Sequence, residues 1–281
     1  MENIILVMNG TKPDISTVDF ACYVAALTHS TIKVLLGACI KESDMPVQKE
    51  LFALPYVETI VAGDIPENKN IWNCVADNGK LVSEACTNRN VNHTIRRNFK
   101  ISASEIITES RFADLIIINP ETSMSGKSES SPTRFVKDIL TAAECPVILS
   151  PYSFDGIREI AFPYDDSEDT VFAIKQFTHL FPALNTKPVN LIHIEQNGGQ
   201  TLPKTDKVMA LLTAHYSNIK FVHLTGDPGN ELFNYLLGKK EMFVVMGAFG
   251  RSPVSNIFRR STASLSLQTI DLPFFIAHNT K

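Results

Sequence analysis

Residues 241–248 read EMFVVMGA, and residues 113–120 read ADLIIINP. Each stretch holds an uninterrupted apolar run between polar or small residues, which is typical of a strand buried on both faces. Strands of this kind form parallel sheets whose faces are covered by helices. The two stretches therefore predict an α/β protein, and their similarity indicates that one structural unit occurs twice along the chain.

The rest of the chain supports this repeat. Each copy alternates apolar strand patterns with helical patterns and reads as five strands joined by four helices. The other matched strand segments are IILVM (4–8) with IREIAFP (157–163), KVLLGACI (33–40) with VNLIHIEQ (189–196), and CPVILSP (145–151) with LPFFIAH (272–278). We predict two tandem Rossmann-like domains, residues 1–153 and 154–281, each with a doubly wound parallel sheet flanked by helices.

The two copies differ in length. Their second strands begin 156 residues apart and their fourth strands 128 residues apart, so the first copy is 28 residues longer between these strands. This insertion, near residues 41–70, mixes apolar residues with prolines and acids, and we expect it to fold back over the first domain. We also expect segments 145–151 and 272–278 to pair across the domain interface, because each would otherwise leave an unpaired sheet edge.

The composition argues against several kinds of function. Lys and Arg total 26 against 30 Asp and Glu, so the net charge of −4 offers no basic surplus for a nucleic-acid backbone. No apolar run reaches the roughly 18 residues that a membrane-spanning helix needs. The five cysteines are widely spaced and include no C-x-x-C pair, which favours free thiols in a cytoplasmic protein over disulfides or a metal site.

The stretch MGAFGRSPVSNIFRRSTASLSLQTI (246–270) carries the most chemical information. A buried strand ends at Met246, Gly247 and Gly250 follow it, and Ser261-Thr262 open a helical pattern. Glycine lets a ligand approach the backbone closely, and the N-terminus of a helix favours phosphate. A plain loop followed by a serine N-cap is the alternative interpretation.

This segment resembles the motif G-x2-G-x9-G-S/T that follows the fourth strand in nucleotide-binding members of the universal stress protein family. The resemblance covers the whole chain as two tandem copies. It includes Cys145-Pro146-Val147, Leu272-Pro273 and the turn Gly226-Asp227-Pro228. It implies the adenine nucleotide alpha hydrolase-like form of the Rossmann fold, with five parallel strands in each domain. It also implies that the two halves pair as an intramolecular pseudo-dimer, to which a homodimer of the whole chain could be added.

The resemblance further implies that an adenine nucleotide (ATP, ADP or AMP) binds the second domain. The residues that match the site are Pro163, Tyr164, Asp165, Ile194, Met246, Gly247, Phe249, Gly250, Arg260, Ser261 and Thr262. Asp165 would lie near the ribose and would hold Mg²⁺ only together with a nucleotide. Arg260 departs from the motif because it takes the place of the third glycine. Its side chain either obstructs the phosphates or binds them as a clamp.

The first copy departs much further from the motif. Gly10 stands where Asp165 stands, Asn119–Thr122 replaces the glycine turn, and Thr133-Arg134 replaces the helix start. We therefore predict a stress-response regulator that binds a nucleotide in its second domain alone. No residue pattern supplies a general base, so no activity beyond slow ATP hydrolysis is expected. The alternative is a tandem stress protein that binds no nucleotide and acts as a protein-interaction module.

Overall fold

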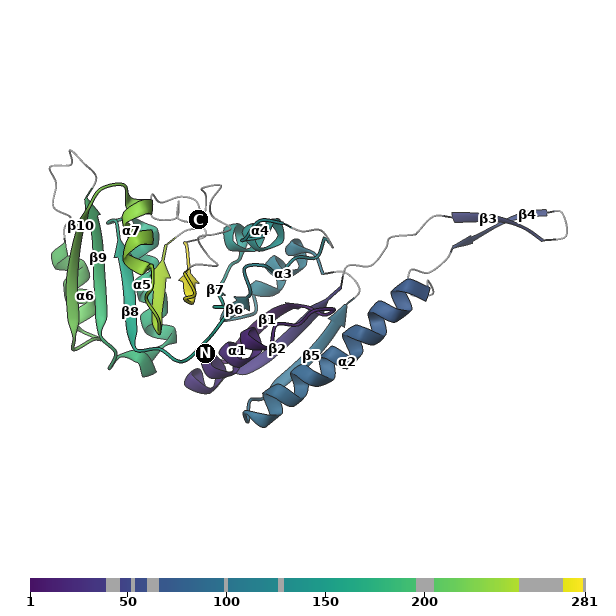
Figure 1. Cartoon of the computed structure of the whole chain (residues 1–281), viewed down its shortest axis with the longest axis horizontal. Helices are drawn as coiled ribbons and strands as arrows, with labels where there is room; N and C mark the ends of the chain where they lie inside the picture. Colours follow the sequence, from purple (N-terminus) through teal and green to yellow (C-terminus); the bar gives the residue numbers. More distant parts are fainter. Residues whose placement is uncertain are drawn as a thin grey trace.

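The computed structural model describes residues 1–38, 46–51, 54–59, 66–98, 101–125, 129–195, 205–247 and 270–279. Within them, ten strands form one continuous sheet and two further strands form a separate hairpin (Figure 1). The order across the large sheet is β10-β9-β8-β11-β12-β7-β6-β1-β2-β5. The sheet thus divides into a first half, built from β1, β2 and β5–β7, and a second half, built from β8–β12.

The two halves share one topology. The first half contains β1 (Asn3–Asn9), β2 (Thr31–Gly37), β5 (His93–Asn98), β6 (Leu115–Ile118) and β7 (Val147–Leu149). The second contains β8 (Glu159–Tyr164), β9 (Val189–Glu195), β10 (Ile219–Thr225), β11 (Met242–Met246) and β12 (Phe274–Ile276). Every neighbouring pair inside a half is parallel, and each half has the order third-second-first-fourth-fifth. The predicted fold class is therefore confirmed.

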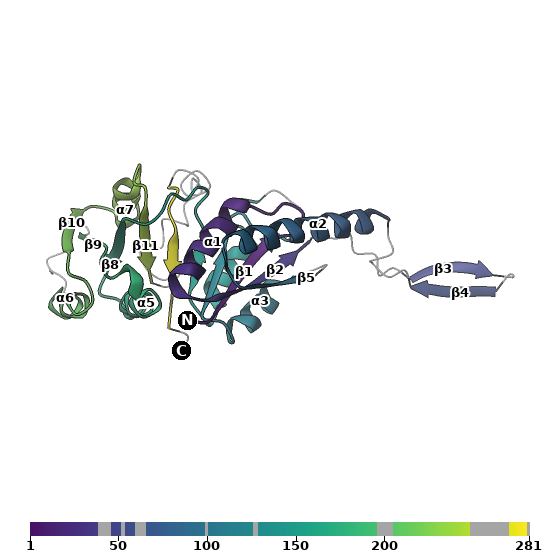
Figure 2. The same cartoon turned by 90° about the horizontal axis from the view of Figure 1, so that it is seen from below.

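Helices cover both faces of the sheet (Figure 2). They are α1 (Ile15–Thr28), α2 (Pro66–Asn88), α3 (Ala103–Ser110), α4 (Arg134–Ala142), α5 (Glu168–Leu180), α6 (Thr205–Thr213) and α7 (Pro228–Leu236), with a 3-10 turn at Pro182–Leu184. Side chains of α1, α2, α5 and α6 join one hydrophobic cluster, and those of α3, α4 and α7 join the other. Strand β1 contributes to both, because successive side chains of a strand point to opposite faces: Leu6 packs on the first cluster and Val7 on the second. The helix expected after residue 261 lies outside the described residues.

The two halves meet at one antiparallel strand pair. Strand β7 pairs with β12 through Leu149↔Phe274, Ile148↔Phe275 and Val147↔Ile276, as expected for segments 145–151 and 272–278. Aromatic rings pack beside this seam: the Phe20 ring of α1 contacts Phe154 edge-on with centroids 5.0 Å apart and lies 6.3 Å from Phe243 of β11. The seam buries the strand edges that each half would otherwise expose.

The inserted segment, near residues 41–70, does not pack as we expected from its sequence. Strands β3 (Pro46–Leu51) and β4 (Leu54–Thr59) form an antiparallel hairpin that pairs with no strand of the large sheet. Figures 1 and 2 both place this hairpin beyond the start of α2, projecting away from the first half. The expectation that residues 41–70 fold back over the first domain is therefore wrong for the described strands. Local pairing between the two strands takes the place of packing against the body.

Candidate functional site

The structure brings the described part of the predicted nucleotide site together at one edge of the second half. Pro163 and Tyr164 end β8, and Asp165 follows them. Ile194 lies near the end of β9, Met246 ends β11, and Gly247 follows it. Strand β8 lies between β9 and β11, so these residues share the carboxyl edge of three adjacent parallel strands. The strand order reverses between β8 and β11, and ligands of doubly wound sheets bind at such switch points. Phe249, Gly250, Arg260, Ser261 and Thr262 lie outside the described residues.

Asp165 is held firmly in place. Its Oδ1 accepts hydrogen bonds from the Ser167 amide (3.1 Å), the Ser167 hydroxyl (2.6 Å) and the Thr170 hydroxyl (2.6 Å). Ser167 is itself the N-cap of α5 and accepts a bond from the Thr170 amide. The second carboxylate oxygen, Oδ2, has no hydrogen bond among the residues that the structure describes. Asp165 therefore fixes the turn with one of its two carboxylate oxygens.

Tyr164 has a structural role in the same turn. Its side chain is buried, and its hydroxyl donates a 2.7 Å hydrogen bond to Asp166 Oδ1. Burial, and then the Asp166 carboxylate, raise the pKa of the Tyr164 hydroxyl above its ordinary value. Asp166 has a left-handed backbone (φ 60°), a conformation that Asp tolerates better than most residues. The turn after β8 is thus stabilised by side-chain contacts on both sides of Asp165.

Gly247 packs closely against the start of α5. A Cβ atom at this position would lie 2.7 Å from the Thr170 amide nitrogen and 2.8 Å from the Asp169 carbonyl carbon. Both are backbone atoms, so any side chain at 247 would have to displace the helix. Packing alone therefore explains the glycine, in addition to the close ligand approach inferred from the sequence.

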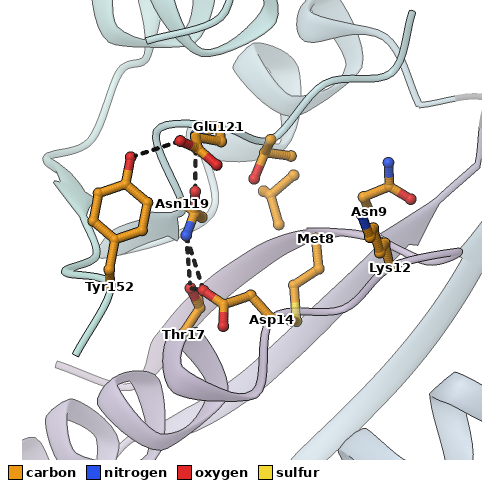
Figure 3. A pocket seen from close by; sticks show the side chains of 10 residues that line it. Met8, Asn9, Lys12, Asp14, Thr17, Asn119, Glu121 and Tyr152 are labelled. Carbon is orange, nitrogen blue, oxygen red and sulfur yellow. Dashed lines mark hydrogen bonds between the residues drawn. The ribbon is translucent and has the colours of Figure 1, made fainter. Parts of the chain in front are cut away.

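The structure shows a cavity in the first half, where the sequence predicted no site. It has a volume of about 300 Å³ and lies at the carboxyl ends of β1 and β6, the equivalent switch point (Figure 3). Its lining residues are Val7, Met8, Asn9, Lys12, Asp14, Thr17, Asn119, Glu121, Thr122 and Tyr152. Asn119 occupies the position that Gly247 has in the second half. Here the first turn of the helix leaves room for a side chain and for a void.

A hydrogen-bonded network lines this cavity. The Asn119 side-chain amide donates to Asp14 Oδ2 at 2.9 Å, and the Thr17 hydroxyl donates to the same oxygen at 2.8 Å. The Tyr152 hydroxyl donates to Glu121 Oε1 at 3.0 Å, and the Glu121 amide donates back to Asn119 Oδ1 at 2.8 Å. Figure 3 shows these groups linked to one another on one side of the cavity, with Asn9 and Lys12 on the other side. The lining mixes polar and apolar side chains and includes charges of both signs.

Side chains of the first half cover the carboxyl end of β2 and the start of α4. Met124 lies over the carboxyl end of β2, where a Cβ on Gly37 would be 2.8 Å from its sulfur. Glu129 takes the start of α4: its Oε2 accepts from the Arg134 amide, and its Oε1 accepts from the hydroxyls of Ser123 and Ser125. These hydrogen bonds, that from Ser123 foremost, hold the pKa of Glu129 below its ordinary value. The Glu129 carboxylate thus accepts hydrogen bonds from the backbone amide at the start of α4 and from two hydroxyls.

Sequence reasoning missed most of this cavity. Asp14 is the N-cap of α1, and the pattern Asp-x-Ser before an apolar helix was a readable signal for that role. Nothing local marks Glu121 or Tyr152, because their contact joins segments 31 residues apart.

The described residues contain no cluster of three His, Cys, Asp or Glu side chains that would suit a metal ion. Asp165 alone offers one free carboxylate oxygen, which fits a Mg²⁺ ion only if a ligand supplies the remaining oxygens. Of the helices that the structure describes, none has both the length and the apolar character needed to cross a membrane.

The fold is similar over its whole length to solved structures of universal stress proteins. One from Archaeoglobus fulgidus gives a TM-score of 0.61 at 13% identity, covering 99% of this chain and 97% of that one. A Pseudomonas aeruginosa protein assigned to the same family gives 0.54 at 13% identity, covering 99% and 93%. A Pseudomonas aeruginosa protein of unknown function gives 0.51 at 12% identity, covering 99% and 92%. No protein-family profile and no curated protein matches the sequence. The chain therefore has the fold of a tandem universal stress protein.

Proposed function

We propose that this chain is a tandem universal-stress-like regulator whose second half binds an adenine nucleotide. The observation that carries the proposal is the meeting of Asp165, Ile194 and the Met246–Gly247 backbone at the switch point between β8 and β11. ATP, ADP and AMP are the candidate ligands. The proposal includes the division into domains 1–153 and 154–281 and their pairing as a pseudo-dimer, which the β7–β12 pair supports. A cytoplasmic location is part of it, because the odd number of cysteines argues against a disulfide framework.

Each residue has a role set by its place. Asp165 Oδ2 would accept a ribose hydroxyl or hold Mg²⁺ together with the nucleotide. The backbone at Ile194 would contact adenine, and the backbone at Gly247 would face the phosphates, with Arg260, Ser261 and Thr262 beyond it. No residue at this edge is assigned as a general base, so the protein acts by binding. A bound nucleotide would change the shape or the surface presented to a partner.

The first half is proposed to bind no nucleotide. Met124 covers the end of β2, and Glu129 holds the amide at the start of α4. Both contacts would have to break before adenine and phosphate could enter. A phosphate placed beside the Glu129 carboxylate would also meet repulsion between like charges.

The test is a calorimetric titration of ATP, ADP and AMP into the full chain, with chromatography of any nucleotide released by heating the purified protein. Arg260→Gly separates the two roles of Arg260: binding tightens about ten-fold if the side chain obstructs and weakens about ten-fold if it clamps. Gly79→Ala, in α2, is a matched glycine control that should leave affinity unchanged.

A second pair of variants guards against misfolding. Gly247→Val should abolish binding, but its side chain would also displace α5. The combined Ser261→Ala and Thr262→Ala variant removes two hydroxyls from the phosphate side without adding volume, and it should weaken binding as well. Circular dichroism distinguishes lost affinity from a lost fold.

One observation favours the second candidate function, a protein-interaction module. The hairpin β3–β4 projects from the body and pairs with no other strand that the structure describes. Isolated two-stranded hairpins are marginal in water, so a partner would stabilise this one. If the wild type and Arg260→Gly both bind no nucleotide at millimolar concentration, the interaction module replaces the nucleotide sensor.

A further inference from the structure

Two cysteines from different helices lie in contact inside the first half. Cys22 is on α1 and Cys86 is near the end of α2, and their Sγ atoms are 3.8 Å apart. Both side chains are buried, with exposed fractions of 1% and 0%. The structure records both as free thiols. The contact therefore joins the helix that follows β1 to the helix that follows the insertion.

The surroundings of the pair favour reaction at Cys86. The Cys22 thiol donates to Cys86 Sγ, and this hydrogen bond stabilises the Cys86 thiolate. This hydrogen bond is the main cause that lowers the pKa of Cys86 to about 7, and His93 and Arg89 lower it further. The same hydrogen bond, with burial, raises the pKa of Cys22. The contact therefore favours Cys86, rather than Cys22, as the sulfur that ionises.

A partly exposed ion pair between Arg89 and Asp19 joins the same two helices as this buried contact. Arg89, at the end of α2, forms an ion pair with Asp19 of α1 at 2.5 Å, and both side chains are more than a third exposed. Ion pairs between such exposed side chains contribute little to stability, so breaking this one costs little free energy. Reaction at the buried sulfur atoms requires a small neutral molecule, such as a peroxide, to enter beside this ion pair.

We propose that Cys22 and Cys86 form a site of oxidative modification, in which a peroxide converts the two thiols into a disulfide that links α1 to α2. The sulfur atoms need to approach by less than about 2 Å, because a disulfide bond is about 2.05 Å long. Both helices contact each other directly, so a small adjustment of two side chains and one helix suffices.

The chemistry balances with peroxide as the oxidant. The Cys86 thiolate attacks one peroxide oxygen, the O–O bond breaks, and hydroxide leaves, which oxidises the sulfur to a sulfenic acid. Cys22 sulfur then attacks the Cys86 sulfur and expels the second oxygen as hydroxide. The proton of the Cys22 thiol converts one hydroxide to water, and a proton from solvent, equal to the one that Cys86 released on ionising, converts the other. Two thiols lose two electrons in total, and the peroxide is reduced to two waters.

The two other cysteines that the structure describes, Cys74 and Cys145, are not expected to form this disulfide. Cys74 is exposed, so it reacts with alkylating reagents before any treatment. Burial, and then the Asp114 carboxylate, raise the pKa of Cys145 to about 12, which keeps it a thiol at neutral pH. Among the described residues, the structure records no other contact between two thiols.

The test treats the folded full chain with hydrogen peroxide at pH 7, removes the oxidant, and alkylates with N-ethylmaleimide under denaturing conditions. We expect the number of alkylated thiols to fall from five to three, and a non-reduced digest to contain the peptide that joins Cys22 to Cys86. Dithiothreitol should restore all five. The matched variant Cys145→Ser should still form the linked peptide, and Cys86→Ser should not.

Three outcomes would overturn the proposal. One is full alkylation of Cys22 and Cys86 after peroxide treatment, and another is a linked peptide dominated by Cys74. The third is a Cys22–Cys86 link that appears only when peroxide is added in denaturant. The wild-type digest decides the matter even if a serine variant fails to fold, and Cys22→Ala gives a second variant without a new polar group.

Discussion

Ser153 and Asp271 are joined across the seam between the two halves of the sheet. The Asp271 carboxylate accepts hydrogen bonds from the Ser153 hydroxyl at 2.5 Å and from the Ser153 amide at 3.0 Å, and its other oxygen accepts from the Tyr152 amide at 2.5 Å. Ser153 follows β7 and Asp271 precedes β12. One carboxylate therefore satisfies the backbone of the connection between the halves at the point where their edge strands pair.

Replacing Asp271 should destabilise the whole chain. Asp271→Ala leaves two backbone amides and a hydroxyl without their acceptor, which costs about 1–3 kcal/mol in the free energy of unfolding. Urea denaturation followed by circular dichroism measures the change. Asp155→Ala is the matched control, since Asp155 is exposed and has no hydrogen bond in the described part of the chain. Equal stability of the two variants would contradict this role for Asp271.

Two glycine substitutions should have opposite effects. Gly247→Ala forces a Cβ to within 2.7 Å of backbone in α5, and such overpacking costs about 1–3 kcal/mol. Gly79 lies inside α2, where an added Cβ would be in ordinary contact with Leu36 at 3.4 Å. Gly79→Ala should therefore raise stability by about 0.5–1 kcal/mol, because alanine restricts the unfolded chain more than glycine does. Thermal unfolding of both variants beside the wild type is the measurement, and a stabilising Gly247→Ala would show that α5 moves freely.

The contribution of Glu109 should depend on pH. Its carboxylate accepts from Lys33 at 2.5 Å and from Arg96 at 2.9 Å, and the Lys33 hydrogen bond is the main cause that holds its pKa below the ordinary value. A lowered pKa in the folded state means that the stabilisation is present above the unfolded pKa of about 4.3 and disappears as the pH falls through the folded pKa.

Glu109→Gln should thus lower the free energy of unfolding at pH 7, by no more than about 1 kcal/mol because Lys33 and Arg96 are partly exposed. The difference from the wild type should shrink as the pH is lowered toward about 3. Urea denaturation at several pH values measures it, with Glu84→Gln as the control at an exposed glutamate. A difference that stays constant with pH would rule out the ionised carboxylate as its cause.

Removing the hairpin should leave the body of the protein stable. Strands β3 and β4 pair only with each other, so replacing residues 46–59 by a short Gly-Ser linker should change the free energy of unfolding by less than about 0.5 kcal/mol. Differential scanning calorimetry checks this. A large loss of stability would mean that the hairpin packs on the body after all, as its composition first led us to expect.

Sequence patterns predicted most of the fold, because a buried parallel strand is a short apolar run that can be recognised from its own residues. Its neighbours in the sheet need not be known. The pairing of β7 with β12 was predicted from the need to bury strand edges, whereas the strand order within each half came from the structure. The position of the hairpin could not be predicted. Apolar residues in the segment 51–57 indicate that something packs there, but they do not identify the packing surface.

The candidate site was predictable only where it is local. Gly247 was singled out because it directly follows a strand, Asp165 was assigned through the resemblance, and the structure places both at the carboxyl ends of adjacent strands. The sequence could not show why residue 247 is glycine. The lack of a side chain allows the close approach of a ligand and the close packing of a helix equally well. Met124 and Glu129 were missed for the opposite reason: their roles come from contacts with Gly37 and with the start of α4, and no spacing along the chain marks them.

The antiparallel seam has a consequence for communication within the molecule. Because β7 and β12 run in opposite directions, the carboxyl ends of the two halves lie at opposite edges of the same ten-stranded sheet. The cavity beside Asn119 and the turn beside Asp165 therefore open away from each other, and molecules bound in them would have no wall in common. Among the described residues, an influence of one occupant on the other would pass through strain or rigidity in β6, β7, β12 and β11 and through the contacts beside them, such as Phe20 with Phe243.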